Sequence, residues 1–355
     1  MKIYSNLIYQ AYLLFCLGLT ILWLPCTMGL SPSYTVGLSF ASALHAGNHN
    51  LPRTWLPDCK EEWLIIETPH FTIHYTAVDE YFSRELAALA EESYDLVTTH
   101  LGLHPDRKTT LYLASSKEVF ISLQPAPSPI SEQAVGLAYP GLFRILLLSP
   151  RAASSGTIQL EKTFIHELTH IVLGSASFSR PSVLIPTWFN EGVCMHEAGE
   201  WNWHYQTLMT RICLTRTIIP FRQLEHSFPS DPDQLQTAYV QSISMVSFIL
   251  DTYGENSLRK IVHLLIRGDE IDKALTASLG LGLDELEILW KKRLRLLYTW
   301  VPVLTSSLVL WFIISIVFLL VYYRKRRISL AKLSAWEEDD IEEWLKKQLS
   351  DLDGL

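Results

Sequence analysis

The sequence has few of the features that mark nucleic-acid-binding proteins and disulfide scaffolds. Its 29 Lys and Arg face 37 Asp and Glu, which gives a net charge of −8. It has no basic stripe and no alternation of aromatic with basic residues, so no nucleic-acid partner is expected. Cysteine is scarce, with five in 355 residues. Cys16 and Cys26 lie in an apolar N-terminal segment, and Cys59, Cys194 and Cys213 allow at most one bridge among themselves.

Charged residues are missing from two long segments, the first of which is N-terminal. None occurs between Lys2 and Arg53, and Leu7–Leu24 is almost entirely apolar. This pattern predicts a signal peptide or an uncleaved anchor within residues 1–30. Residues 31–60 are rich in Ser, Gly, Pro, Ala and Asn, which is typical of a linker.

The second uncharged segment predicts a C-terminal transmembrane helix at residues 299–323, which is long enough to span a bilayer. Four basic residues, Arg324–Arg327, follow it directly. Because Lys2 leads the N-terminal segment, we expect the domain at residues 61–298 outside the cytoplasmic membrane and a short tail at 324–355 inside. The protein is thereby expected to cross the cell membrane once, or twice if the N-terminal segment is not cleaved.

The pattern His166-Glu167-x-x-His170 lies in the segment between these two ends. Apolar residues recur around it at helical spacing: Leu160, Phe164, Leu168 and Ile171. We expect Gly174 to end this helix. On a helix, the two histidines lie on one face one turn apart, so they can hold one Zn²⁺ while Glu167 takes a proton from a bound water. The alternative is a buried amphipathic helix with two satisfied histidines.

A second motif, Trp-Phe-Asn-Glu-Gly at residues 188–192, follows downstream. Zinc in hydrolases takes three protein ligands and keeps one position open for water. Glu191 on a following helix would complete a His₂Glu set with the two histidines. We expect Thr187 to cap this helix and Gly192 to let it approach the motif helix closely. The alternative for Glu191 is an exposed carboxylate that the helix dipole favours.

Together the two motifs resemble those of the gluzincin metallopeptidases, and within them the peptidase MA-like family. The resemblance extends over roughly residues 71–295. It implies a zincin-like domain in which His166, His170 and Glu191 bind zinc and Glu167 is the general base.

The resemblance has one departure and one further consequence. Thermolysin-type enzymes carry an acidic residue four positions after the ligand Glu, where this sequence has Met195. Glu197 or a backbone carbonyl is expected to support a ligand histidine instead. The run at residues 238–242 resembles the family pattern downstream of the metal site, which implies Tyr239 as the hydrogen-bond donor to the developing oxyanion. A core position is the alternative for Tyr239, and Tyr205 is the competing donor.

The remaining patterns predict the architecture. Alternating or apolar runs predict four strands, at Phe71–Tyr75, Thr109–Ala114, Gly136–Tyr139 and Arg144–Ser149. Helical spacing predicts helices at Asp79–Leu101, Gln236–Thr252, Ser257–Ile266, Ile271–Leu279 and Leu283–Leu297. We therefore expect an α+β fold, with a small mixed sheet, an active-site helix, a mainly helical C-terminal part and one transmembrane helix. The resemblance implies that an edge strand of the sheet pairs with extended substrate.

These features predict a membrane-anchored, extracytoplasmic zinc peptidase that acts on peptides or proteins. Peptide bonds would be hydrolysed through zinc-bound water, with Glu167 as general base. The alternative is a catalytically idle zinc-fold binding or scaffold module at the membrane. Glu167 argues against it, because a structural zinc site needs ligands but no base. An intramembrane protease is excluded because Glu161 and Lys162 lie within one helical turn or so before the motif, which therefore does not stand in an apolar span.

Overall fold

The computed structural model describes residues 62–124, 134–152, 159–178, 183–300 and 307–352. The segments predicted at residues 1–30 and 31–60 therefore lie outside the described residues. The chain divides into two compact units. The first comprises the chain up to Asp95 together with Asp106–Ile171, and the second comprises Leu96–Pro105 together with the chain from Val172 onward.

A five-stranded sheet forms the centre of the first unit. Its strands are β1 (Leu64–Glu67), β2 (Phe71–Tyr75), β3 (Thr109–Ala114), β4 (Gly136–Tyr139) and β5 (Arg144–Leu148), in the order β1-β2-β3-β5-β4. The three inner strands run parallel, and both outer strands pair antiparallel to their neighbours. The mixed sheet and its four predicted strands are confirmed. Strand β1 was not predicted, because its side chains are largely exposed and show no alternation.

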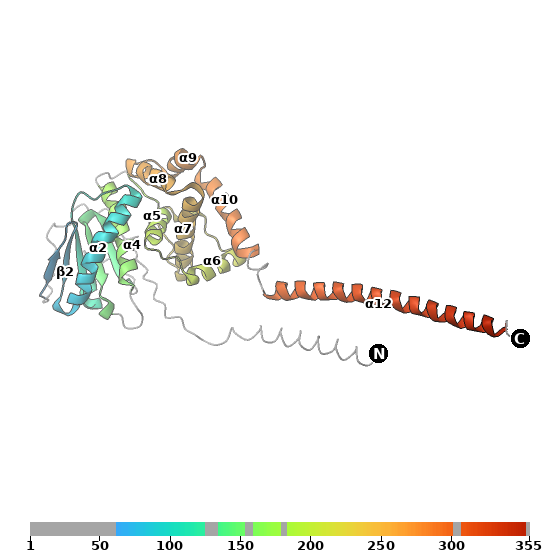
Figure 1. Cartoon of the computed structure of the whole chain (residues 1–355). Helices are drawn as coiled ribbons and strands as arrows, with labels where there is room; N and C mark the ends of the chain where they lie inside the picture. The colour runs from blue at the N-terminus through green and yellow to red at the C-terminus, as the bar shows by residue number, and fades with distance from the viewer. Residues whose placement is uncertain (1–61, 125–133, 153–158, 179–182, 301–306, 353–355) are drawn as a thin grey trace. The chain divides into compact units, whose positions relative to one another are not determined.

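Two helices cover one face of this sheet (Figure 1). They are α2 (Glu80–Leu101) and α4 (Leu160–Phe178). The Phe71 ring of β2 contacts both, at 5.9 Å from the Tyr94 ring of α2 and 5.7 Å from the Phe164 ring of α4. The sheet and both helices thus share one core, which fixes the helix that carries the histidine motif.

A short helix, α3 (Lys117–Ser122), packs on the opposite face. Ser116 caps its first turn by accepting a hydrogen bond from the Val119 backbone N–H. Phe120 is fully buried in one cluster with Tyr112 of β3. Tyr112 points to this face because successive residues of a strand point alternately to its two faces.

The prediction that Gly174 ends the motif helix was wrong, since α4 continues to Phe178. A single glycine inside a helix costs only about 1 kcal/mol relative to alanine, which neighbouring contacts can offset. Here Leu173 is buried, and the Ser175 hydroxyl donates to the Val172 carbonyl at 3.2 Å.

The second unit is helical. Its elements are α5 (Thr187–Glu197), α6 (Trp203–Thr215), η5 (Phe221–Leu224), α7 (Pro232–Tyr253), α8 (Glu255–Arg267), α9 (Ile271–Leu279), α10 (Leu283–Arg295) and the π-helical turn η6 (Leu296–Trp300). The four helices predicted after residue 235 are confirmed. Helix α7 begins earlier than predicted, because Asp231 accepts a bond from the Gln234 N–H at 3.0 Å and so caps it. Helix α6 was not predicted.

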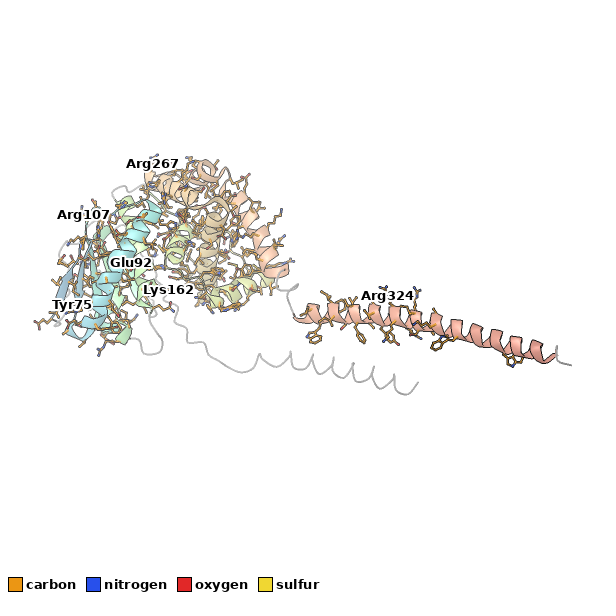
Figure 2. The ribbon with its side chains drawn as sticks, viewed as in Figure 1. Tyr75, Glu92, Arg107, Lys162, Arg267 and Arg324 are labelled. Carbon is orange, nitrogen blue, oxygen red and sulfur yellow. The ribbon has the colours of Figure 1, made fainter. Side chains whose placement is uncertain are left out.

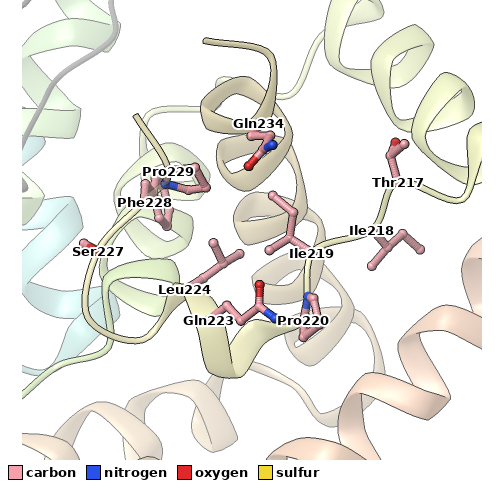
Figure 3. Close-up of a pocket in the computed structure, with 10 residues that line it drawn as sticks. All are labelled: Thr217, Ile218, Ile219, Pro220, Gln223, Leu224, Ser227, Phe228, Pro229 and Gln234. Carbon is pink, nitrogen blue, oxygen red and sulfur yellow. The ribbon is translucent and has the colours of Figure 1, made fainter. Parts of the chain in front are cut away.

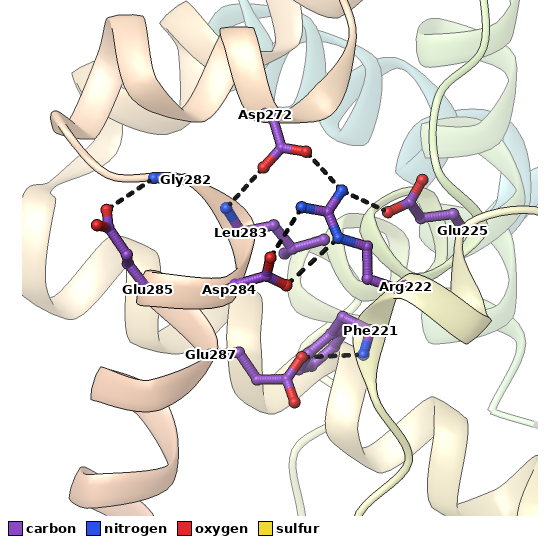
Figure 4. Close-up of polar contacts among 9 residues, drawn as sticks. All are labelled: Phe221, Arg222, Glu225, Asp272, Gly282, Leu283, Asp284, Glu285 and Glu287. Carbon is purple, nitrogen blue, oxygen red and sulfur yellow. Dashed lines mark hydrogen bonds and ion pairs between the residues drawn. The ribbon is translucent and has the colours of Figure 1, made fainter.

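A polar cluster around Arg222 ties η5 to α9 and α10 (Figure 4). The guanidinium of Arg222 pairs with Asp272 of α9 and with Asp284 of α10, the latter at 3.2 Å. One residue earlier, the Phe221 N–H donates to the carboxylate of buried Glu287 at 3.0 Å. The position of η5 is therefore fixed by side chains from two later helices.

The last helix is α12 (Ser307–Leu352). Its side chains at residues 310–332 are exposed, among them Arg324 (Figure 2). Within the part of the chain that the structure covers, no helix has both the length and the apolar character needed to cross a membrane. The span predicted at 299–323 includes residues 301–306, which are not described. That span stays a prediction.

Candidate metal centre

Helix α4 brings together the three motif residues of the first unit. His166 and His170 are each 2% exposed and Glu167 is 1% exposed. They are held by the apolar face of α4, of which Phe164 and Leu168 are fully buried. The motif is thus helical and buried, as its spacing predicts.

The two imidazoles point their Nε2 atoms at each other, at a distance of 3.2 Å. Two nitrogens bound to one tetrahedral Zn²⁺ at 2.0–2.1 Å would be roughly 3.4 Å apart. The pair therefore fits a shared cation without rearrangement. The same distance would also allow one N–H···N bond between complementary tautomers, which is the alternative with satisfied histidines.

Glu167 lies directly against Gly136, the first residue of edge strand β4. A Cβ atom at position 136 would be 2.7 Å from Glu167 Oε1 and 2.6 Å from Thr163 Cγ2. A side chain there would displace the side chains of Glu167 and Thr163 on α4. Gly136 consequently lets β4 run beside the proposed base, at one outer edge of the described sheet.

Helix α5 of the second unit carries Glu191, which is 2% exposed, and fully buried Cys194. Both therefore lie on the inner side of one helix. The alternative interpretation of Glu191 as an exposed helix-start carboxylate is therefore wrong. Thr187 is not the cap either, because Pro186 occupies that position and no side chain caps the helix.

Gly192 was expected to let this helix approach the motif helix, but the atoms nearest to a Cβ at this position belong to α7. A Cβ at position 192 would lie 2.5 Å from the Ser242 carbonyl oxygen and 2.7 Å from Val246 Cγ2. Helix α5 is thereby packed tightly on α7, which holds the turn with Glu191 in place.

Three buried residues with nitrogen and sulfur donors, His166, His170 and Cys194, form a group that could hold a metal ion. The two histidines were predicted for this role, whereas Cys194 was not. Its position three residues after Glu191, on the same helix, was the signal available in the sequence.

The two candidate oxyanion donors are both buried in the second unit. The Tyr239 ring of α7 meets the Phe228 ring edge-on at 5.0 Å. Tyr205 lies on α6, where burial raises the pKa of its phenol well above the ordinary value. A phenol offers one O–H donor, so either residue could donate a hydrogen bond.

Glu197, expected as a support for a ligand histidine, bonds a different histidine. Its carboxylate lies 2.6 Å from Nδ1 of His100, near the end of α2. The hydrogen bond to Glu197 is the main reason that the pKa of His100 is raised. Arg259 of α8 holds the same corner by donating to the His100 carbonyl at 3.1 Å. This pair anchors the C-terminal end of α5.

The comparison with protein families agrees with these elements. A family model of the Peptidase MA superfamily matches residues 93–296, which is more than half of the chain. The chain belongs to the Peptidase MA superfamily. The match runs from the second half of α2 to η6, and so contains α4, α5 and α7. No curated protein matches the sequence.

Membership in this superfamily confirms the predicted resemblance at the level of the peptidase clan, and it indicates a peptidase. Peptidases of this clan are typically metal-dependent, in agreement with the buried donor residues on α4 and α5.

Proposed function

We propose that this protein is a zinc-dependent peptidase of the gluzincin type. The observation that carries the proposal is the 3.2 Å separation of the two Nε2 atoms, in a buried helix whose next residue after the first histidine is a carboxylate. A structural site would need the ligands but not Glu167.

His166, His170 and Glu191 would hold the metal. Two neutral imidazoles and one carboxylate are a donor set that suits Zn²⁺ and leaves a fourth position open. When bound, zinc supplies a Lewis acid that acidifies water and polarises the scissile carbonyl.

Glu167 moves the proton in this scheme. Its carboxylate accepts a proton from the attacking water and returns it to the amine nitrogen that leaves. Tyr239 donates a hydrogen bond to the carbonyl oxygen as negative charge develops there. Because Glu167 is almost fully buried, bulk water does not compete for the proton.

Strand β4 would bind the substrate in an extended conformation. It lies at the edge of the sheet, and Gly136 places it in contact with Glu167. A peptide that adds to this edge would bring its backbone close to the base, and main-chain bonds would supply affinity that does not depend on sequence.

The proposal includes anchoring by the C-terminal segment at 299–323, with the peptidase domain on the extracytoplasmic side. It is supported by the 28 uncharged residues at 296–323 and by the four basic residues that follow.

The proposed function is tested with the purified full-length chain. We expect about one zinc per chain and hydrolysis of a mixed peptide library. Glu167→Gln should keep the zinc and lose at least about 10²-fold in kcat/KM, the usual scale for a general base. Full hydrolysis by Glu167→Gln, or a wild-type chain that binds zinc but cleaves nothing, would exclude the peptidase and favour an idle zinc-fold module.

A further inference from the structure

A pocket of about 480 Å³ lies in the second unit, between the segment at residues 217–229 and the first turns of α7 (Figure 3). Its walls are mainly apolar and include Ile218, Ile219, Leu224 and Phe228. None of the ten lining side chains is ionisable. Its volume falls in the range of sites that bind small molecules or parts of a peptide.

Two glutamine amides are among the polar groups that line this pocket. Gln223 of η5 and Gln234 of α7 lie at opposite sides of the apolar walls (Figure 3). Each amide offers both a donor and an acceptor, which matches the N–H and C=O of a peptide group.

The frame of the pocket is pinned by hydrogen bonds. Gln241 of α7 is fully buried and bonds both backbone groups of Ile219: its Nε2 donates to the carbonyl at 2.8 Å, and its Oε1 accepts from the N–H at 2.9 Å. Two residues after Ile219, the backbone N–H of Phe221 donates a hydrogen bond to the carboxylate of buried Glu287. The pocket is therefore preformed, which lowers the entropic cost of binding.

Two contacts connect the pocket to residues proposed for catalysis. Its wall residue Phe228 packs on Tyr239. The backbone carbonyl of Glu225, which follows Leu224 of η5, accepts a hydrogen bond at 2.8 Å from the backbone N–H of Thr187, the first residue of α5. Glu191 lies one turn further along α5.

From these contacts we infer that the pocket is a subsite for one uncharged, apolar side chain of the substrate and the peptide group beside it. This inference rests on the proposed peptidase function. Apolar walls favour burial of an apolar side chain. A Lys or Glu side chain would lose its hydration there without meeting an opposite charge, so it would be rejected.

The test introduces one negative charge without a change of shape, in Gln223→Glu and separately in Gln234→Glu. Gln206→Glu on α6 is the matched control, because Gln206 is exposed and does not line the pocket. Each full-length variant is given a library of capped pentapeptides in which one position varies among Leu, Phe, Lys and Glu. Both lining side chains are exposed, so the fold should persist, and equal melting temperatures check this.

Both lining variants should shift the kcat/KM ratio of Lys over Leu by at least about tenfold, at the same substrate position. Gln206→Glu should stay within about twofold of wild type. Unchanged preference in both lining variants, or an equal shift in Gln206→Glu, would overturn the inference.

Direct binding separates this inference from the proposed function. Calorimetry with Glu167→Gln, alone and combined with Gln223→Glu or Gln234→Glu, measures the Lys and Leu pentapeptides without turnover. If the charged variants switch the binding preference while the wild-type chain hydrolyses nothing, the subsite is supported and the peptidase is refuted. If wild type hydrolyses the peptides and neither Gln223→Glu nor Gln234→Glu changes the preference between Lys and Leu, the peptidase is supported and the subsite is refuted.

Discussion

Gly136 of strand β4 and Glu167 of helix α4 are in contact, so close that a methyl group at position 136 would be 2.7 Å from the Glu167 carboxylate oxygen. The strand and the carboxylate of the proposed base can lie this close only because residue 136 has no side chain. A contact of this kind ties the geometry of the carboxylate to a residue that does no chemistry itself.

Gly136→Ala should therefore impair activity more than stability. The new methyl group would push the flexible carboxylate of Glu167 aside, and displacement of a catalytic group by about 1 Å can cost 10²-fold. We expect at least a tenfold loss in kcat with the zinc retained, and a melting temperature a few degrees lower. Thr163→Ala removes the other close contact, at 2.6 Å. The double variant should recover stability but not activity; recovery of both would mean that the carboxylate was never displaced.

The identity of the third metal ligand can be decided with two isosteric substitutions on α5. If Glu191 is the ligand, Glu191→Gln should weaken zinc binding at least tenfold, because a neutral amide is a poor zinc donor. Cys194→Ser should then keep about one zinc per chain. Elemental analysis after dialysis measures both. The reverse result would assign the third position to Cys194.

Tyr239→Phe should lower kcat by about 10²–10³-fold with little change in KM, as expected for a donor that acts in the transition state. The ring packs on Phe228 in either form, so fold and zinc content should survive. Tyr205→Phe is the paired variant, since Tyr205 is equally buried. If Tyr205→Phe loses activity and Tyr239→Phe does not, the hydrogen-bond donor to the oxyanion is Tyr205 on α6.

The His100–Glu197 pair predicts a dependence of stability on pH. The hydrogen bond raises the pKa of His100 in the folded protein. The pair therefore contributes its full free energy to folding at pH values below the unfolded pKa of about 6.5. This contribution is lost as the pH rises through the higher pKa of the folded state. The contribution at low pH should be about 1–3 kcal/mol, the scale of a hydrogen bond to a charged group.

The measurement is the difference in unfolding free energy between wild type and His100→Gln across pH 5–9. This difference should shrink as pH rises. Glu255, 3.9 Å from Nε2 of His100, also raises the pKa of His100, whereas the positive charge of Arg259 lowers it. The difference between the two proteins is used, and not the wild-type stability alone, because burial lowers the pKa of His196. That lowered pKa makes the free energy of unfolding rise with pH, which is opposite to the effect of His100. A constant difference would show that His100 is not charged in the folded protein.

Local patterns predicted the elements whose side chains alternate or repeat. Strands β2 and β3 have one inward face, and α7 has a long buried stripe, so periodicity revealed them. Helix α6 was not predicted, although its buried residues Tyr205, Met209 and Ile212 have helical spacing. The cluster of aromatic residues at its start obscured that spacing.

The candidate site was predictable only where it is local. The two histidines share one helix, and their spacing alone places them on one face. The contact of Gly136 with Glu167 joins a strand to a helix far along the chain, and no periodicity encodes such a contact. For the same reason Glu197 was considered, beside a backbone carbonyl, as the support of a ligand histidine, whereas it bonds His100, 97 positions away.

The amide of Gln241 holds Ile219 by its backbone alone, in the way that a neighbouring β-strand would. The chain path at this point is therefore independent of which side chain residue 219 carries. Neither Glu nor Leu could replace Gln241, because Glu would repel the carbonyl and Leu would leave both backbone groups unsatisfied. The molecule thus separates a fixed scaffold from an interchangeable lining, so new substrate preferences could be evolved or engineered at position 219 without rebuilding the loop.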